Sequence, residues 1–93
     1  MKKIINGKMY NDETAEEICT QSDGLMYNDF THVHKILYKK KTGEFFLEIY
    51  GGPMTQYKGE TSIKPITIET AKKFIEEHGT AEKYTELFGE VEE

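Results

Sequence analysis

Arginine and tryptophan are absent from this chain of 93 residues, and cysteine occurs only once, as Cys19. A single cysteine excludes an intrachain disulfide and a cysteine-based zinc site. Arginine makes most bidentate contacts to guanine and phosphate, so its absence, together with a formal net charge of −5, argues against sequence-specific DNA binding. No segment approaches the roughly 18 apolar residues of a membrane-spanning helix, and no apolar stretch of signal-peptide length follows Lys2 and Lys3. We therefore expect a protein of a reducing cytoplasm.

The composition is that of one small globular domain. Hydrophobic residues make up 37% and aromatic residues 12% of the chain, which argues against wholesale disorder. The length matches one domain and allows one small core. We expect a single domain over residues 1–89, followed by an acidic tail over residues 90–93.

Turn and cap signals predict the order of the elements. Asn6-Gly7 between short apolar runs is typical of a tight β-hairpin. Thr14 and Glu17 have capping-box spacing, and Asn11 and Asp12 are further cap candidates. With Ala15, Ile18 and Cys19 on one face, this segment predicts a short helix that ends near Ser22.

The middle of the chain predicts a second hairpin. Residues 32–40 and 44–50 are rich in strand-forming side chains and are joined by a turn in which Gly43 suits the left-handed position. Phe45, Leu47 and Ile49 form the expected core face of the second strand. The alternate face, with Phe46 and Tyr50, is unusually aromatic, so either another element or a partner covers it.

The remaining elements complete an α+β fold. Pro65-Ile66 predicts a short edge strand. Thr67 and Thr80 are expected to cap two helices, which end at Gly79 and Gly89. The predicted order is ββα-ββ(β)-αα, with antiparallel hairpins packed against two or three short helices, because segregated strands and helices favour an α+β fold over a parallel sheet.

Most candidate sites have a simple structural interpretation. His32 and His34 share one face of a predicted strand and would need a third ligand to bind a metal ion, so we expect neither a metal nor another cofactor. Acidic neighbours raise the expected pKa of Cys19, which then acts as a small core residue. The role of the segment Gly51-Gly52-Pro53 is either a strand-exit turn or a functional loop that presents Met54 and Tyr57. The three lysines of residues 39–41 form either a solvated turn or a weak phosphate contact.

Acidic residues dominate the C-terminal part. Residues 1–68 carry nine acids and nine lysines, whereas residues 69–93 carry eight acids and three lysines, which accounts for the whole net charge of −5. The simple interpretation is the solvated side of two amphipathic helices. The alternative is an acidic face that binds a basic cleft in another protein and competes there with nucleic-acid phosphates.

Three segments resemble small proteins carried by phages, plasmids and conjugative elements of low-GC Gram-positive bacteria. They are residues 5–10 (INGKMY) with 13–15 (ETA), residues 37–47 (LYKKKTGEFFL) with 51–54 (GGPM), and residues 82–90 (EKYTELFGE). Many proteins of this kind are uncharacterised, and some act as anti-CRISPR or anti-restriction inhibitors. The resemblance therefore implies a mobile-element protein, and it assigns no catalytic or binding residue.

These observations lead to the hypothesis of a non-enzymatic inhibitor that binds a host defence protein, most plausibly a CRISPR effector nuclease. The expected protein-binding residues are four helix acids and three apolar anchors: Glu76, Glu77, Glu82, Glu86, Tyr50, Met54 and Tyr57.

Two alternatives stay open. The first is a self-associating accessory domain, a homodimer through Tyr38, Phe46 and Tyr50. The second is a small hydrolase, which requires a buried carboxylate with a shifted pKa. A chain this short rarely forms the concave pocket that such chemistry needs, so we expect no enzyme activity.

Overall fold

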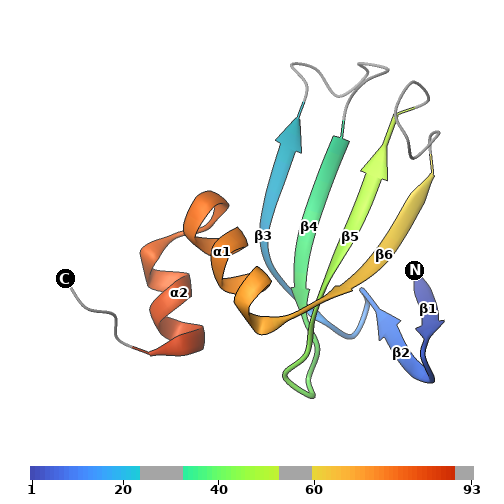
Figure 1. Ribbon diagram of the computed structural model, residues 1–93, viewed down its shortest axis with the longest axis horizontal. Helices are drawn as coiled ribbons and strands as arrows, with labels where there is room; N and C mark the ends of the chain where they lie inside the picture. The colour runs from blue at the N-terminus through green and yellow to red at the C-terminus, as the bar shows by residue number, and fades with distance from the viewer. Residues whose placement is uncertain (24–32, 53–59, 90–93) are drawn as a thin grey trace.

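The computed structural model describes residues 1–23, 33–52 and 60–89, which form an α+β fold of two antiparallel sheets and two short helices (Figure 1). The expected fold class is confirmed. The two-stranded sheet contains β1 (Lys2–Ile5) and β2 (Lys8–Asn11). The four-stranded sheet follows the chain order β3 (Glu16–Asp23), β4 (Val33–Lys39), β5 (Phe45–Gly51) and β6 (Thr61–Ile66). The helices are α1 (Ile68–His78) and α2 (Ala81–Phe88).

Both predicted hairpins are present. Asn6 and Gly7 have φ values of 52° and 78°, as a tight hairpin turn requires, and Ile5 lies opposite Lys8. The turn between β4 and β5 is closed by the N–H of Gly43, which donates to the carbonyl oxygen of Lys40 over 2.9 Å. Gly43 has a φ of 94°, in the region that favours glycine.

The helix predicted after Thr14 is wrong, because the chain there forms β3 and pairs with β4 along its whole length. Asn11 and Thr14 form a turn instead of a helix cap: the Asn11 side-chain oxygen accepts from the N–H of Glu13, and the Thr14 hydroxyl donates to the Asn11 carbonyl. A bulge between Glu17 and Cys19 interrupts the register. Pairing of the backbone with β4 outweighs the local helix signal.

The four-stranded sheet has an apolar cluster on each face. Ala71 and Ile75 of α1 pack against the face that carries Phe45, Leu47 and Ile49, which confirms the predicted core face. On the opposite face, Tyr10 of β2 packs with three other buried side chains, those of Tyr38, Phe46 and Ile63. The aromatic face of β5 is therefore covered by the N-terminal hairpin, which is another element of the same chain.

Candidate protein-binding surfaces

The two helices form as the sequence predicts. The hydroxyl of Thr67 accepts from the N–H of Thr70 over 3.2 Å, and the hydroxyl of Thr80 accepts from the N–H of Lys83 over 3.1 Å. The N–H of Gly79 donates to the carbonyl of Ile75 and ends α1. These caps fix where each helix begins, and so they fix which residues lie on its outer side.

The four expected helix acids are all exposed to solvent. The side chain of Glu77 is 70% exposed and that of Glu86 is 63% exposed, whereas Ala71 and Ile75 of α1 are buried against the sheet. Glu76 and Glu77 therefore lie on the side of α1 that faces away from the sheet. Of the described residues, none forms an ion pair with Glu76 or Glu82, and Glu77 contacts only His78 over 3.5 Å.

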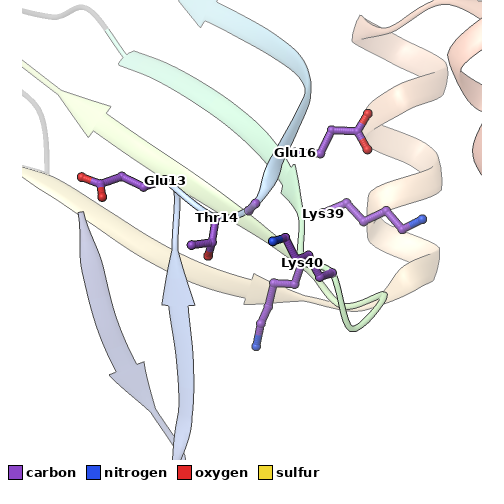
Figure 2. A pocket seen from close by; sticks show the side chains of 7 residues that line it. Glu13, Thr14, Glu16, Lys39 and Lys40 are labelled. Atoms are coloured by element: carbon purple, nitrogen blue, oxygen red, sulfur yellow. The ribbon is translucent and has the colours of Figure 1, made fainter.

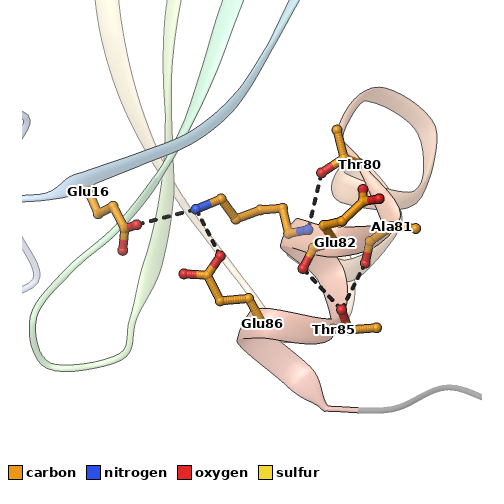
Figure 3. Close-up of polar contacts among 7 residues, drawn as sticks. Glu16, Thr80, Ala81, Glu82, Thr85 and Glu86 are labelled. Carbon is orange, nitrogen blue, oxygen red and sulfur yellow. Dashed lines mark hydrogen bonds and ion pairs between the residues drawn. The ribbon is translucent and has the colours of Figure 1, made fainter.

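Glu86 differs from the other three acids because it has a lysine partner (Figure 3). The ammonium group of Lys83 lies 3.4 Å from the Glu86 carboxylate and 3.5 Å from the carboxylate of Glu16 in β3. The hydrogen bond to Glu86 is the largest cause of the raised pKa of Lys83. This ion-paired cluster connects α2 to the sheet and neutralises part of the charge of Glu86.

The structure does not bring Tyr50 together with the helix acids. Tyr50 alternates along β5 with Ile49, whose side chain faces the helices, so Tyr50 lies on the opposite face of the sheet. It is half-buried and lies opposite His34 and Thr61. Met54 and Tyr57, the other two expected anchors, lie outside the described residues.

The aromatic surface considered for a homodimer is mostly covered. Phe46 is completely buried and Tyr38 is 9% exposed. The Tyr10 ring meets the Phe46 ring edge-on at 5.5 Å, and the Tyr38 ring stacks on Phe46 at 5.2 Å. Burial is the first cause that raises the pKa of Tyr38 to about 12.

The lysines of the β4–β5 turn line a cavity of about 410 Å³, shown in Figure 2. Its walls also include two acids, and the lining residues are Glu13, Thr14, Ala15, Glu16, Lys39, Lys40 and Lys41. Lys40 is engaged within the protein, since its ammonium group lies 3.3 Å from Glu44 and 4.3 Å from the centre of the Tyr10 ring. The mixed charges of the walls do not favour an anion, and Lys40 is held by partners within the chain and not by solvent.

A carboxylate pair, Glu48 and Asp12, was not predicted as a site. Glu48 lies in β5 between Ile36 and Ile63 of the neighbouring strands, and its Oε2 atom is buried without a hydrogen-bond partner among the described residues. Burial, followed by the hydrogen bond with Asp12, raises the pKa of Glu48 to about 7. The hydrogen bond with Glu48 and the N-terminal ammonium group, 2.6 Å away, lower the pKa of Asp12.

The Glu48 carboxyl group meets the requirement that we set for a hydrolase, a buried carboxylate with a shifted pKa. However, it lines neither the cavity described above nor the adjacent cavity of about 180 Å³ beside Met9 and Thr42. The sequence places Glu48 two residues after Phe46, and therefore on the same face of the strand. This position indicates a desolvated carboxyl group, because an acid on an aromatic face is expected to lose contact with water.

The remaining candidates have ordinary surroundings. Burial raises the pKa of the half-buried Cys19 thiol. The pKa is therefore raised as expected, but the cause is burial and not the acidic neighbours. His78 packs against the Phe74 ring at 4.9 Å, and His32 lies outside the described residues. In the described ranges, no three histidine, cysteine or acidic side chains gather as metal ligands would.

Comparison with protein-family models, with curated proteins and with solved structures gave no significant match. Neither α1 nor α2, the helices of the described part, is long and apolar enough to cross a membrane.

Proposed function

We propose that the protein is a non-enzymatic inhibitor from a mobile genetic element, which binds a CRISPR effector nuclease and occupies its nucleic-acid site with the acidic face of α1 and α2. The observation that carries this proposal is the exposure of Glu76, Glu77 and Glu82 on the two helices, without a lysine partner in the described part of the chain. The resemblance to small mobile-element proteins supports the class of partner.

The mechanism is electrostatic and steric. A nuclease channel that binds a phosphate backbone is lined by cations, and carboxylates on a small rigid body interact with the same cations. Opposite charges increase the association rate, and the bound domain then excludes the nucleic acid. The caps of Thr67 and Thr80 satisfy backbone N–H groups at the starts of the two helices, which stabilises the helices that carry the acids.

The Glu86 carboxylate contributes less to this surface, because Lys83 already balances part of its charge. Tyr50 lies on the opposite face of the sheet and belongs to a separate surface. The proposal therefore depends on Glu76, Glu77 and Glu82.

The test compares two triple variants in a bacterial host with active CRISPR immunity. The helix variant is Glu76→Lys, Glu77→Lys and Glu82→Lys. The matched control is Glu13→Lys, Glu17→Lys and Glu60→Lys, in which all three acids are exposed and lie outside the helices. Both variants change the net charge by +6, so they differ only in where the charge is reversed.

The expected result is that the wild-type protein and the control variant restore plaque formation by a targeted phage, whereas the helix variant does not. Circular dichroism of the purified variants checks that both are folded. Equal protection of the phage by the two variants would overturn the acidic-face mechanism. Failure of the wild-type protein to protect the phage would overturn the proposed function itself.

A further inference from the structure

The outer edge of β1 is unpaired within the described part of the chain, where β2 is the only strand that pairs with it. In Figure 1, β1 lies at the outside of the molecule, on the far side of the sheet from the two helices. A strand with a free edge is a template for pairing with a further strand.

The register shows which backbone groups this edge offers. The carbonyl oxygen of Met1 accepts from the N–H of Asp12 over 3.2 Å, so Met1 and Asp12 form a hydrogen-bonded pair. Such pairs alternate along an antiparallel ladder, which places Lys3 and Ile5 in the next bonded pairs. The N–H and C=O groups of Lys2 and Ile4 consequently point away from β2, toward the free edge.

An apolar pair lies beside these groups. Ile4 is directly opposite Met9, and their side chains are 67% and 52% exposed. The pair is of the non-hydrogen-bonded kind, in which side chains approach most closely and form one continuous apolar surface. The other face of the hairpin carries Tyr10, which is buried against Phe46. The hairpin therefore holds its free edge and its apolar pair in a fixed position.

Lysine is the only charged residue type within the two strands of the hairpin, and Asp12, which follows β2, is paired with the N-terminal ammonium group. Residues 2–11 contain three lysines and no acid. Lys8 is paired with Glu44 over 3.0 Å, but Lys2 and Lys3 are exposed and have no ion pair with a described residue. A second copy of β1 would bring these lysines close to one another, which is unfavourable, whereas an acidic strand would be attracted.

We propose that the free edge of β1 binds an extended, acidic segment of another protein as a third strand of the N-terminal hairpin. Its backbone pairs with Lys2 and Ile4, its acidic side chains face Lys2 and Lys3, and an apolar side chain covers Ile4 and Met9. Nucleic acid fits this surface less well, because the exposed apolar pair lies at its centre and the whole chain carries a net charge of −5. This inference is independent of the acidic face of the helices.

The test titrates the isotope-labelled full chain with a blocked hexapeptide, Thr-Val-Val-Glu-Glu-Thr, and follows backbone and methyl signals by NMR. In antiparallel pairing the second valine lies opposite Ile4, and the two glutamates lie opposite Lys3 and Lys2. The expected shifts are confined to residues 2–5 and to the methyl groups of Ile4 and Met9. An absence of shifts in β1 at millimolar peptide overturns the proposal.

Two control peptides separate strand pairing from simple charge attraction. The first carries N-methyl groups on the second valine and the second glutamate, which removes the backbone donors directed at β1. The second carries lysine in place of glutamate. Both are expected to bind about tenfold more weakly or worse, since each lost hydrogen bond or ion pair costs about 1 kcal/mol. Equal binding by either control peptide contradicts the proposal.

The protein variants give a matched pair at one position. Ile4→Pro removes the outward N–H without removing a hydrogen bond to β2, and proline is tolerated on a strand edge. Ile4→Val keeps both the N–H and the apolar side chain. We expect Ile4→Pro to bind the peptide about tenfold more weakly and Ile4→Val to bind like wild type. Unchanged signals of Tyr10 and Phe46 check that the hairpin stays docked in both variants.

Two further probes distinguish other occupants, namely a single-stranded oligonucleotide and vesicles with anionic headgroups. If either probe shifts the β1 signals and the peptide does not, the acidic segment is the wrong occupant. Shifts in β1 that grow with protein concentration alone would identify a second copy of the chain and would also overturn the proposal.

Discussion

A carboxyl group that holds its proton near neutral pH lies in the middle of β5. Glu48 is placed between Ile36 and Ile63, and it shares a hydrogen bond with Asp12. Two carboxyl groups this close cannot both ionise easily, so the proton stays on the more buried one. Sequence alternation placed Glu48 on the aromatic face of β5, but the contact with Asp12 depends on how the N-terminal hairpin docks, which no local pattern specifies.

The pair predicts that stability decreases as the pH rises. In the unfolded chain Glu48 ionises near 4.5, whereas in the folded protein its pKa is about 7. The folded state therefore binds more protons between these values, and stability is lost between about pH 4.5 and pH 7. Glu48→Gln removes this dependence, and it is expected to raise the free energy of unfolding at pH 8 by about 1–2 kcal/mol, since water screens part of the shift. Urea unfolding at pH 5 and pH 8 measures both effects.

Asp12 affects stability in the opposite direction, because its pKa is lowered in the folded protein. Its contribution to the free energy of unfolding is present above the ordinary pKa of an aspartate and is lost as the pH falls below it. A wild-type stability that rises between pH 5 and pH 8 would contradict the assignment of the proton to Glu48.

Tyr10 connects the N-terminal hairpin to the main sheet. It is 5% exposed and contacts the Phe46 ring, whereas its neighbour Met9 is 52% exposed. We expect Tyr10→Ala to cost about 3–5 kcal/mol through the lost apolar burial and the cavity that remains. The matched control, Met9→Ala, should change stability by less than about 1 kcal/mol. Thermal unfolding of the two variants measures the difference, and equal costs would show that the hairpin is not docked through Tyr10.

At the scale of elements, the segments whose local signals agree with the final pairing were predicted, whereas β3, whose local signal favoured a helix, was not. Asn6-Gly7, Gly43, Thr67 and Thr80 determine turns and caps through the residues next to them, and both hairpins and both helices follow. β3 depends on pairing with β4, whose partner residues lie between 10 (Asp23 and Val33) and 23 (Glu16 and Lys39) positions further along the chain. Because of the bulge in β3, the adjacent residues Ile18 and Cys19 both pack against the apolar cluster that includes Ala71 and Ile75 of α1. The apolar residues of β3 therefore have a sequence spacing that resembles one face of a helix.

The caps of the helices give a prediction with an internal control (Figure 3). Thr80→Ala removes the oxygen that accepts from the N–H of Lys83 and should cost about 0.5–2 kcal/mol. The Thr85 hydroxyl donates to the carbonyls of Ala81 and Glu82 within the same helix, so Thr85→Ala removes no cap. We expect Thr85→Ala to be neutral or slightly stabilising, because alanine is the better helix former. Chemical denaturation compares the two, and an equal loss would show that Thr80 does not cap α2.

At the scale of the whole molecule, charge is distributed unevenly between two regions. The helices present exposed glutamates on one side of the sheet, and the N-terminal hairpin presents lysines at its other side (Figure 1). The concentration of acids in the C-terminal part is visible in the sequence itself. The sequence did not show that Lys83 balances Glu86, or that Tyr50 lies on the opposite face, because both depend on how the helices pack on the sheet.

Salt dependence follows from this arrangement. The attraction of exposed acids to a cationic channel weakens as the Debye length falls from about 10 Å at 0.1 M salt to about 3 Å at 1 M. Under the proposed mechanism, the half-maximal inhibitory concentration of the protein against a CRISPR effector nuclease is therefore expected to rise steeply with salt. Control reactions without inhibitor measure the effect of salt on the nuclease alone. An inhibitory concentration that is independent of salt would indicate an apolar interface.

The most direct test of the acidic-face mechanism is the order of addition in DNA cleavage by a purified CRISPR effector nuclease of a low-GC Gram-positive host. The acidic-face mechanism predicts strong inhibition when the protein is added before the target DNA and little inhibition when the DNA is bound first. It also predicts no inhibition by the variant with Glu76→Lys, Glu77→Lys and Glu82→Lys. Inhibition that is equal in both orders, or that persists in this variant, would contradict the account.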